Sequence, residues 1–297
     1  MTTEPSLDGL LLVDKPCGPT SHQVVAAVRR LTGQRRIGHA GTLDPMASGL
    51  LPLVLGRATR LVGFLPRSPK VYEGRLRLGV TTTTDDTTGK VLSRHAGPPP
   101  RPSEVLRACE RFHGRLRQTP PRISALKVGG RRLYRLAREG RPVSPSPRDV
   151  EVFSFVVRAT EDPDEWAFTA AVSPGTYLRA IARDLGETLG TGGALSALRR
   201  TAIGSLSVAS AVSLPSGSEG GAAVIAAVVP IDVMPLDAPA VRLVEPEEVR
   251  KFTAGVAIDL AHPPPSDGPC RFTDPSGVLL GIGLVSGGRA RPKVVLP

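Results

Sequence analysis

Cysteine is scarce in this chain, and no pattern of metal ligands is visible. The three cysteines, Cys17, Cys109 and Cys270, lie far apart, and no pair has the C-x-x-C spacing. The five histidines are scattered and form no H-E-x-x-H motif. Neither a zinc ribbon nor a disulfide framework is indicated, and we therefore expect no metal site.

Long apolar runs are also missing. No stretch of about twenty apolar residues occurs, so we expect no membrane span. The N-terminal residues MTTEPSLDG lack the basic start and the apolar core of a signal peptide. Together with the few cysteines, these absences favour a cytoplasmic protein that does not associate with membranes.

Aromatic residues make up only 4% of the 297 residues, and three of them are tyrosines, so each tyrosine is a candidate for a specific role. Basic residues are in excess instead, with a formal net charge of +11 and a pI of about 10.4. Such a charge favours a polyanionic partner, most simply a nucleic acid. The alternative is a generally basic protein from a GC-rich genome, in which arginine is common for coding reasons.

More than half of this charge lies in one segment. Residues 120–150 carry eight basic and two acidic side chains, a net charge of +6. The basic residues are Arg122, Lys127, Arg131, Arg132, Arg135, Arg138, Arg141 and Arg148. Leu133, Leu136 and Ala137 have helical spacing, which allows a solvated helix. Because the charge is so concentrated, we prefer a segment that grips phosphates.

Residues 36–51, RIGHAGTLDPMASGLL, contain a single carboxylate, Asp44. Two glycines precede it and give backbone freedom, and Pro45 biases Asp44 toward an extended conformation. The apolar run at 50–55 predicts a buried element that anchors the loop. On spacing alone, the choice is between an ordinary surface turn and a fixed presentation of a reactive carboxylate.

Hydrophobic periodicity predicts both strands and helices in the rest of the chain. We expect strands at 10–13, 70–80, 151–157, 166–172 and 203–212. We expect helices at 21–33, 58–65, 103–112, 176–190 and 245–252, a short helix that carries Leu195 and Leu198 and ends at 199–200, and a short helix or strand at 222–229. The expected N-caps are Thr20 or Ser21, Ser103 and Thr176. A boundary near 236–239 divides the chain into residues 1–236 and a small β-rich module at 237–297.

Asp85 and Asp86 are adjacent in the stretch TTTTDDTTGK. Two neighbouring carboxylates can suggest a metal site. Neighbours along an extended chain point in opposite directions, however, and no third ligand is near. We therefore predict a turn, which Gly89 favours.

Several motifs, in the same order, resemble the TruB family of tRNA pseudouridine-55 synthases. They are the K-P-x-G-x-T-S pattern at 15–21, GHAGTLDPMASGLL around Asp44, TTTTDDTTGK, and SPGTYLRAIARDLGETLGTGGALSALRR from residue 173. The resemblance covers most of residues 9–204. The basic segment resembles the family's insertion over the RNA stem-loop, and the C-terminal module resembles its PUA-like module. The chain departs from the family at the start of TTTTDDTTGK and at Ile123, where relatives often carry an aromatic residue.

The resemblance implies a fold and three catalytic residues. The fold is α+β, with a mixed, mainly antiparallel sheet core flanked by helices. Asp44 matches the family nucleophile, and an aspartate is already ionised at neutral pH. Tyr72 matches the active-site tyrosine and Arg179 the basic partner of the carboxylate, which favours the ionised form. Without the resemblance, Tyr72 reads as a buried strand aromatic and Arg179 as a phosphate contact or surface residue.

Other positions match the family's substrate-binding residues. Tyr177 and Leu198 match the lining of the uracil pocket, although Leu198 also suits plain core packing. His39 matches a residue beside the flipped base, and a simple hydrogen-bonding role is the alternative. The residues expected to bind the RNA backbone are Lys15, Arg122, Lys127, Arg131, Arg132 and Arg135.

The implied reaction converts uridine-55 in the T-loop of tRNAs to pseudouridine after the base has flipped into a pocket. No cofactor, metal or guide RNA is implied, and we expect a monomer whose partner is the tRNA T-arm. Residues alone leave open whether Asp44 attacks the ribose or the pyrimidine ring, or acts as a base. The alternative functions are an RNA-guided pseudouridine synthase of a protein–RNA particle and a non-catalytic tRNA-folding factor.

Overall fold

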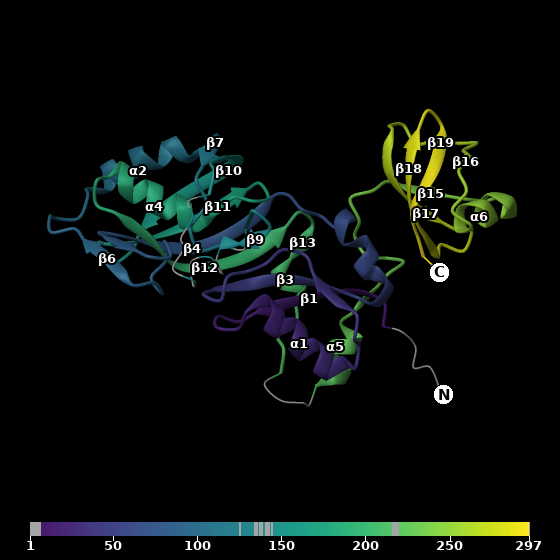
Figure 1. Cartoon of the computed structure of the whole chain (residues 1–297), viewed down its shortest axis with the longest axis horizontal. Helices are drawn as coiled ribbons and strands as arrows, with labels where there is room; N and C mark the ends of the chain where they lie inside the picture. The colour runs from purple at the N-terminus through teal and green to yellow at the C-terminus, as the bar shows by residue number, and fades with distance from the viewer. Residues whose placement is uncertain are drawn as a thin grey trace.

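The computed structural model describes residues 7–124, 126–133, 136, 139, 143, 145–215 and 220–296. A large sheet with helices packed on it forms most of the molecule, and a smaller sheet lies at one end (Figure 1). Within the described part of the chain, no helix is long and apolar enough to cross a membrane.

The large sheet is mixed and mainly antiparallel, which confirms the predicted α+β class. Among the described strands of this sheet, only β3 and β12 pair in parallel. The strand order is β14 (Val229–Pro230), β1 (Gly9–Lys15), β3 (Ala47–Leu55), β12 (Gly193–Ile203), β4 (Lys70–Leu78), β11 (Glu165–Val172), β10 (Arg148–Ala159) and β7 (Gly114–Gln118), with β2 (Ile37–His39) beside β3 and β13 (Leu206–Ser207) beside β12.

Helices α2 (Pro102–Cys109) and α4 (Leu178–Thr188) lie over β4, β11 and β10 (Figure 1). Ile181 and Leu185 of α4 join Leu76 of β4 and Phe155 of β10 in one buried cluster. Burial of such apolar side chains is the main stabilising term of the fold. Near the other end of the sheet, α1 (Ser21–Thr32) packs against α5 (Gly221–Ala226). The remaining short elements of this part are η1 (Gly56–Phe64), β5 (Val80–Thr82), β6 (Val91–Arg94), η2 (Glu110–Phe112), β8 (Lys127–Val128), β9 (Arg131–Arg132) and η3 (Val208–Ser210).

Helix α1 begins and ends where the sequence predicts. The Thr20 side chain accepts a hydrogen bond from Gln23 N, and the Gln23 side chain accepts one from Thr20 N, which forms a capping box. At the other end, Gly33 has φ of 68° and ends the helix in the left-handed conformation that glycine favours.

The predicted strand at 70–80 is confirmed over residues 70–78, and Gly79, with φ of 80°, separates it from β5. In β4, Tyr72, Leu76 and Leu78 are buried, whereas Glu73 is exposed. Strands β10 and β11 pair antiparallel, as their sequences predict. Tyr72 lies opposite Ala170 of β11 and Arg200 of β12, so the tyrosine stands in the middle of the sheet.

The short helix predicted around Leu195 and Leu198 is wrong, because these residues belong to strand β12. This strand lies between β3 and β4, and Ala194 and Leu195 are both fully buried. A strand that is covered on both faces shows no apolar–polar alternation. Two bulges, between Leu195 and Ala197 and between Arg200 and Ala202, disturb the pattern further.

Three smaller predictions are also corrected. The strand expected at 203–212 is limited to the end of β12 and the two residues of β13, and η3 follows. The caps at Ser103 and Thr176 are not used: α2 starts after Arg101 with proline at its first position, and α4 starts after Tyr177. The helix expected at 58–65 is the 3₁₀ helix η1.

The C-terminal residues form a second sheet with its own core. The strand order is β15 (Ala240–Arg242), β17 (Gly268–Thr273), β18 (Leu279–Ser286), β19 (Arg289–Val295) and β16 (Ile258–Asp259), and α6 (Pro246–Thr253) packs on it. Phe252 and Phe272 lie in its core, with ring centroids 4.6 Å apart. Ile282 belongs to a different cluster, shared with Ile203 and Met234 of the preceding part. The exact boundary at residues 236 and 237 stays a prediction.

Candidate active site

The loop between β2 and β3 carries Asp44, and buried polar groups hold it. Arg200 of β12 is fully buried, and its guanidinium donates to the carbonyl oxygens of Leu50 (2.8 Å) and Gly41 (2.9 Å). Gly41 has φ of +95°, which a residue with a side chain rarely adopts. The loop conformation therefore depends on a glycine and on an arginine from a distant part of the sequence.

The segment before α1 supports the same loop from the other side. Ser21 Oγ accepts a hydrogen bond from Leu43 N at 3.0 Å and donates to its carbonyl oxygen at 3.2 Å. Gly18 N donates to Pro45 O at 2.8 Å. The K-P-x-G-x-T-S pattern thus supports the backbone on both sides of Asp44.

Lys15 does not fit the predicted phosphate contact. Its side chain is fully buried, and Nζ donates to the carbonyl oxygens of Pro16 (2.8 Å) and Pro19 (2.9 Å). Burial is also the main cause that lowers the pKa of this lysine. Lys15 therefore stabilises the turn before α1 and is not placed to bind RNA.

Asp44 and Arg179 lie together. Arg179 Nε and Nη2 contact the same oxygen, Asp44 Oδ2, at 2.9 and 2.8 Å. The arginine side chain is 5% exposed, whereas that of Asp44 is 38% exposed. Arg179 Nη1 also donates to Thr84 O (2.7 Å) and Ile123 O (3.1 Å). One guanidinium therefore connects the Asp44 loop, the turn after β5 and the start of the basic segment.

Two further carboxylates, Asp86 and Asp85, belong to this network, although the sequence analysis gave them only a turn. Asp86 Oδ2 lies 3.7 Å from Arg179 Nε, and its side chain is 7% exposed. Asp85, at φ of 59° in the predicted turn, pairs with Arg183 at 3.0 Å. Burial raises the pKa of Asp85, and Arg183 opposes that shift. The signal that could have found this network is the spacing of Arg179 and Arg183, one helical turn apart.

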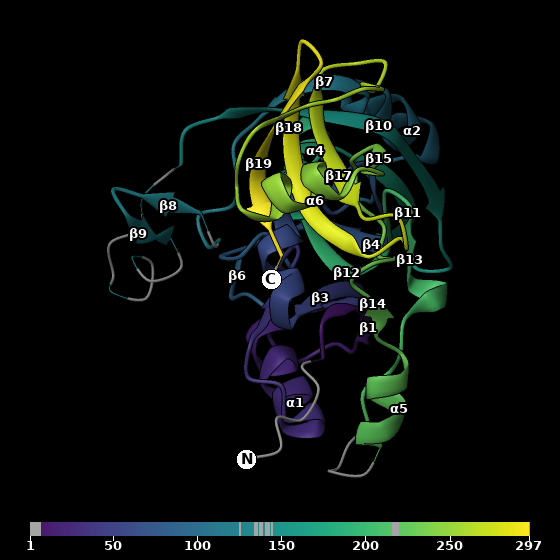
Figure 2. The ribbon, with the colours of Figure 1, turned by 90° about the vertical axis from the view of Figure 1, so that its right-hand side faces the viewer.

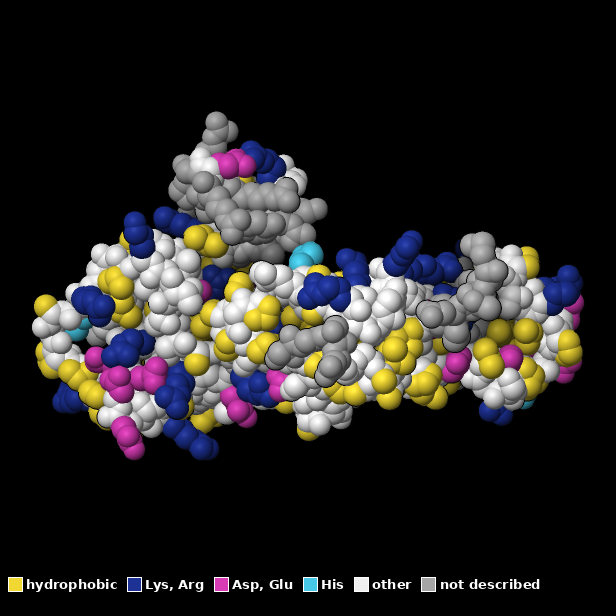
Figure 3. Space-filling view, turned by 90° about the horizontal axis from the view of Figure 1, so that it is seen from below, with side chains coloured by type: hydrophobic (Ala, Val, Ile, Leu, Met, Phe, Trp, Pro, Cys, Tyr) yellow, Lys and Arg dark blue, Asp and Glu magenta, His cyan; other side chains and the backbone are white. Residues whose placement is uncertain are grey.

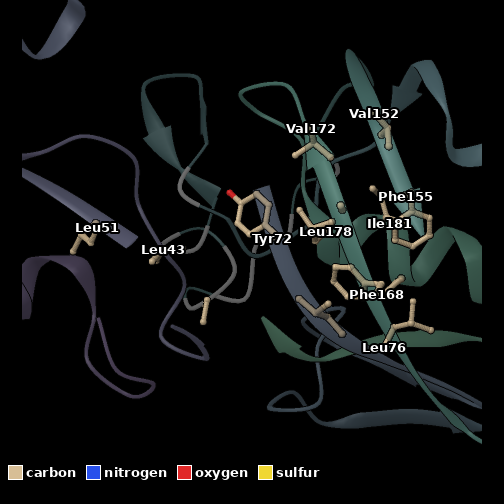
Figure 4. Packing of buried hydrophobic residues seen from close by; sticks show 14 of the residues in the cluster. Leu43, Leu51, Tyr72, Leu76, Val152, Phe155, Phe168, Val172, Leu178 and Ile181 are labelled. Atoms are coloured by element: carbon tan, nitrogen blue, oxygen red, sulfur yellow. The ribbon is translucent and has the colours of Figure 1, made fainter. Parts of the chain in front are cut away.

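A cavity of about 170 Å³ opens beside this network. Asp44, Tyr72, Arg179, Tyr177 and Leu198 all contribute to its lining, so the structure brings together five of the six residues predicted to be catalytic or to bind substrate. Figure 4 shows Tyr72 between Leu43 and Leu178, with its hydroxyl turned away from the cluster around Phe168.

Tyr177 is held by a residue that the sequence analysis missed. Gln118, buried at the end of β7, donates through Nε2 to Tyr177 O (3.1 Å) and accepts from Tyr177 N (2.9 Å) through Oε1. The Arg148 guanidinium lies 4.9 Å from the centroid of the Tyr177 ring. The cavity wall at Tyr177 is thus fixed at its backbone and covered by a cation.

His39 is not among the described residues that line the cavity. It lies on β2 opposite Leu53, and its ring is 5.4 Å from the ring of His22. Lys70, which the sequence analysis did not select, lines the cavity instead. Among the described residues, no group of three or more histidine, cysteine, aspartate or glutamate side chains could hold a metal ion.

Three of the predicted RNA-backbone residues of the basic segment lie on a projecting hairpin, and Arg122 precedes it. Strands β8 and β9, which contain Lys127, Arg131 and Arg132, extend away from the large sheet (Figure 2). Arg122 and Arg131 are exposed, and Arg131 pairs with Glu139 at 2.6 Å. Arg135 lies outside the described residues. Lysine and arginine side chains are also spread along the whole length of the face seen in Figure 3.

A second, larger cavity of about 460 Å³ is lined by the outward residues of the same sheet, including Glu73, Arg75 and Arg158. Glu73 and Arg75 of β4 alternate with Tyr72, so these two side chains lie on the other face of the strand. Neither Asp44 nor Arg179 lines this larger cavity. We therefore identify the smaller cavity as the candidate active site.

Three family models match this chain. The model of the TruB family pseudouridylate synthase N-terminal domain matches residues 29–178. A model of the tRNA pseudouridylate synthase B C-terminal domain matches residues 179–216, and the model "Pseudouridine synthase II TruB, C-terminal" matches residues 239–296.

Whole-length relatives extend the match. A protein of Thermobifida fusca named tRNA pseudouridine synthase B is 44% identical, and the match covers 97% of this chain and 98% of that protein. A protein of Acaryochloris marina with the same name is 40% identical, with 97% and 99% covered. Among solved structures, a chain of an H/ACA RNP bound to a substrate RNA containing 2′-deoxyuridine matches with a TM-score of 0.71 at 22% identity. The match covers 98% of this chain and 86% of that chain, which shows a shared fold. The chain belongs to the TruB family of pseudouridylate synthases.

Proposed function

We propose that this protein converts uridine-55 in the T-loop of tRNAs to pseudouridine, without a guide RNA and with Asp44 as the nucleophile. The observation that carries the proposal is the Asp44 carboxylate held by Arg179 at the edge of a cavity. The relatives named tRNA pseudouridine synthase B support tRNA as the substrate. We also propose that the protein acts as a monomer.

The cavity suits a base that has left its stack. A uridine inside an RNA loop cannot present its glycosidic bond to a side chain until it is flipped out. Tyr72 and Tyr177 offer ring faces and Leu198 an apolar contact for the extruded pyrimidine. The flipped base then lies beside the only carboxylate among the described lining residues, Asp44.

The two oxygens of Asp44 have different surroundings. Oδ2 accepts both contacts from Arg179, whereas Oδ1 accepts no hydrogen bond within the described residues. An ionised carboxylate oxygen that is not engaged is the better nucleophile. We therefore assign the attack, at the ribose or at the pyrimidine ring, to Oδ1, while Arg179 keeps the group ionised and oriented.

The proposed reaction balances without a second reactant. Asp44 Oδ1 forms a bond to the ribose or to the ring, the bond between N1 of uracil and the ribose breaks, and the base turns. C5 then forms the new bond to the ribose, the bond to Asp44 Oδ1 breaks again, and C5 loses a proton while N1 gains one, directly or through solvent. Tyr72 is the group proposed to exchange that proton, because its hydroxyl is the polar end of a ring that lines the cavity. Substrate and product contain the same atoms.

A synthetic T-stem-loop hairpin with tritium at C5 of its uridines tests the function. We expect purified protein alone to release tritium from position 55, and a hairpin with cytidine at that position to release none. Release that requires an added guide RNA would favour the RNA-guided alternative. Binding of the hairpin without any release would favour a tRNA-folding factor.

We also propose that the basic segment at 120–150 grips the RNA backbone and that residues 237–297 form a PUA-like RNA-binding module. The separate core around Phe252 and Phe272 and the family match at 239–296 support the second assignment. For the first, the support is the exposure of Arg122 and the exposure of Arg131 on a hairpin that stands away from the sheet.

Changing Arg122 and Arg131 together to glutamine is expected to weaken hairpin binding and to flatten its salt dependence. Removing one contact to a phosphate lowers the slope of log K against log salt by about 0.7–0.9. The measurement is hairpin affinity by fluorescence anisotropy between low and moderate salt. Arg107 and Arg111, equally charged and exposed on α2 and η2, provide the matched control pair. An unchanged slope in the Arg122 and Arg131 variant would count against the gripping role.

A further inference from the structure

Lys70 brings a positive charge into the active-site cavity. It is the first residue of β4 and lies two positions before Tyr72, so the two side chains share one face of the strand. Both line the cavity. Within the part of the chain that the structure describes, the Lys70 ammonium forms no ion pair, whereas Arg179, the other cation of the lining, is already paired with Asp44.

Two more cations approach Lys70. Arg200 of β12 and Arg67 of the preceding turn are the charged groups that act most on it. None of the three cations, Lys70, Arg200 and Arg67, forms an ion pair with a described carboxylate. Arg200 donates instead to backbone carbonyl oxygens such as those of Leu50 and Gly41. Like charges held together in this way favour binding of an anion.

Gly41 leaves room at this position. A side-chain carbon built on Gly41 would lie 3.8 Å from Lys70 Nζ and 3.5 Å from Arg200 Nη1. The loop that carries Asp44 therefore passes within van der Waals contact of both cations at Gly41. Arg67 is exposed, Lys70 is half-buried and Arg200 is fully buried, so the positive charge runs from solvent inward beside the cavity.

We propose that Lys70 is a phosphate-binding residue of the active site and that its ammonium binds a backbone phosphate next to the nucleotide whose base enters the cavity. This inference rests on the proposed function. A flipped nucleotide keeps its own phosphates, which must then lie at the rim of the cavity. A lysine binds phosphate as a point charge, so the contact positions the nucleotide without reading its base.

The free protein disfavours the charge that this contact needs. Burial is the main cause that lowers the pKa of Lys70 to about 8, and Arg200 and Arg67 add to it. A bound phosphate raises the pKa of Lys70 again, so Lys70 takes up a proton when the hairpin binds above pH 8. The other titratable or charged groups among the described lining residues are Asp44, Arg179, Tyr72 and Tyr177, and Arg148 lies over the Tyr177 ring. Hairpin affinity is therefore expected to fall as the pH rises through 8, by up to about tenfold per pH unit.

The first experiment measures the affinity of the T-stem-loop hairpin from pH 6.5 to 9.0 at constant salt. For Lys70→Met, we expect roughly ten- to hundredfold weaker binding at pH 7 and no fall above pH 8. For Lys70→Arg, which stays charged, we expect tight binding without that fall. Lys90→Met removes an exposed lysine that does not line the cavity and is expected to keep the wild-type profile.

The second experiment identifies the phosphate. Hairpins carry a neutral methylphosphonate at either phosphate that flanks the target uridine. We expect one of them to weaken binding by wild type and to have no further effect on Lys70→Met. The inference would be overturned if both methylphosphonate hairpins lost as much affinity for Lys70→Met as for wild type. It would also be overturned if the hairpin affinity of Lys70→Met kept the wild-type dependence on pH. A wild-type protein that binds the hairpin without isomerising it would instead contradict the proposed function.

Discussion

Replacing Asp44 with asparagine is expected to lower the rate of pseudouridine formation by at least about 10⁴-fold and to leave hairpin affinity nearly unchanged. Asparagine has the same shape as aspartate, so the loop held by Arg200 and Ser21 keeps its conformation. The amide is neutral and lacks the nucleophilic oxygen. Single-turnover tritium release with excess enzyme measures this loss without interference from product release.

Asp14→Asn is the matched control for this variant. Asp14 also forms an ion pair with an arginine, Arg199, at 2.7 Å, and it is similarly accessible, with 26% of its side chain exposed. Asp14 does not line the active-site cavity. We expect this variant to keep nearly the wild-type rate. Measurable pseudouridine formation by Asp44→Asn, or an equal loss in Asp14→Asn, would remove the nucleophile assignment.

Local signals predicted the parts of the site that depend on the nearby chain. The capping box of Thr20 and Gln23 and the αL glycine at 33 determine both ends of α1 within a few residues of sequence. The alternation in β4 put Tyr72 on the buried face of its strand. The assignment of Asp44 required more, because a Gly-rich turn with one carboxylate is common. The resemblance of its whole loop singled it out.

Distant contacts account for what the sequence did not reveal. Strand β12 has helix-like spacing and is a strand because β3 and β4 pair with it on both sides. Lys15 looks like a phosphate ligand until the fold buries it against the carbonyl oxygens of Pro16 and Pro19. Lys70 gives no signal in a charged, alternating strand, since only the cavity distinguishes it from an ordinary surface lysine.

Arg179→Met is expected to abolish activity and to destabilise the fold. The Asp86 side chain is 7% exposed and that of Arg179 is 5% exposed, so the substitution leaves a buried carboxylate without its cation. Breaking a buried ion pair costs about 3–5 kcal/mol, which corresponds to a decrease of roughly 10 °C in the unfolding midpoint of a domain of this size. Differential scanning calorimetry and single-turnover tritium release measure the two effects.

A second substitution separates stability from catalysis. Asp86 Oδ1 accepts hydrogen bonds from Thr84 Oγ1 at 2.8 Å and from Thr88 N at 3.0 Å. In the double variant Arg179→Met with Asp86→Asn, the carbonyl oxygen of the asparagine can still accept both bonds. Position 86 then carries no buried charge, so we expect the unfolding midpoint to recover in part. Activity should stay absent, because Asp44 still lacks the guanidinium that orients Oδ2. If activity returned along with stability, Arg179 would have only a structural role, and the carboxylate would act without a cationic partner.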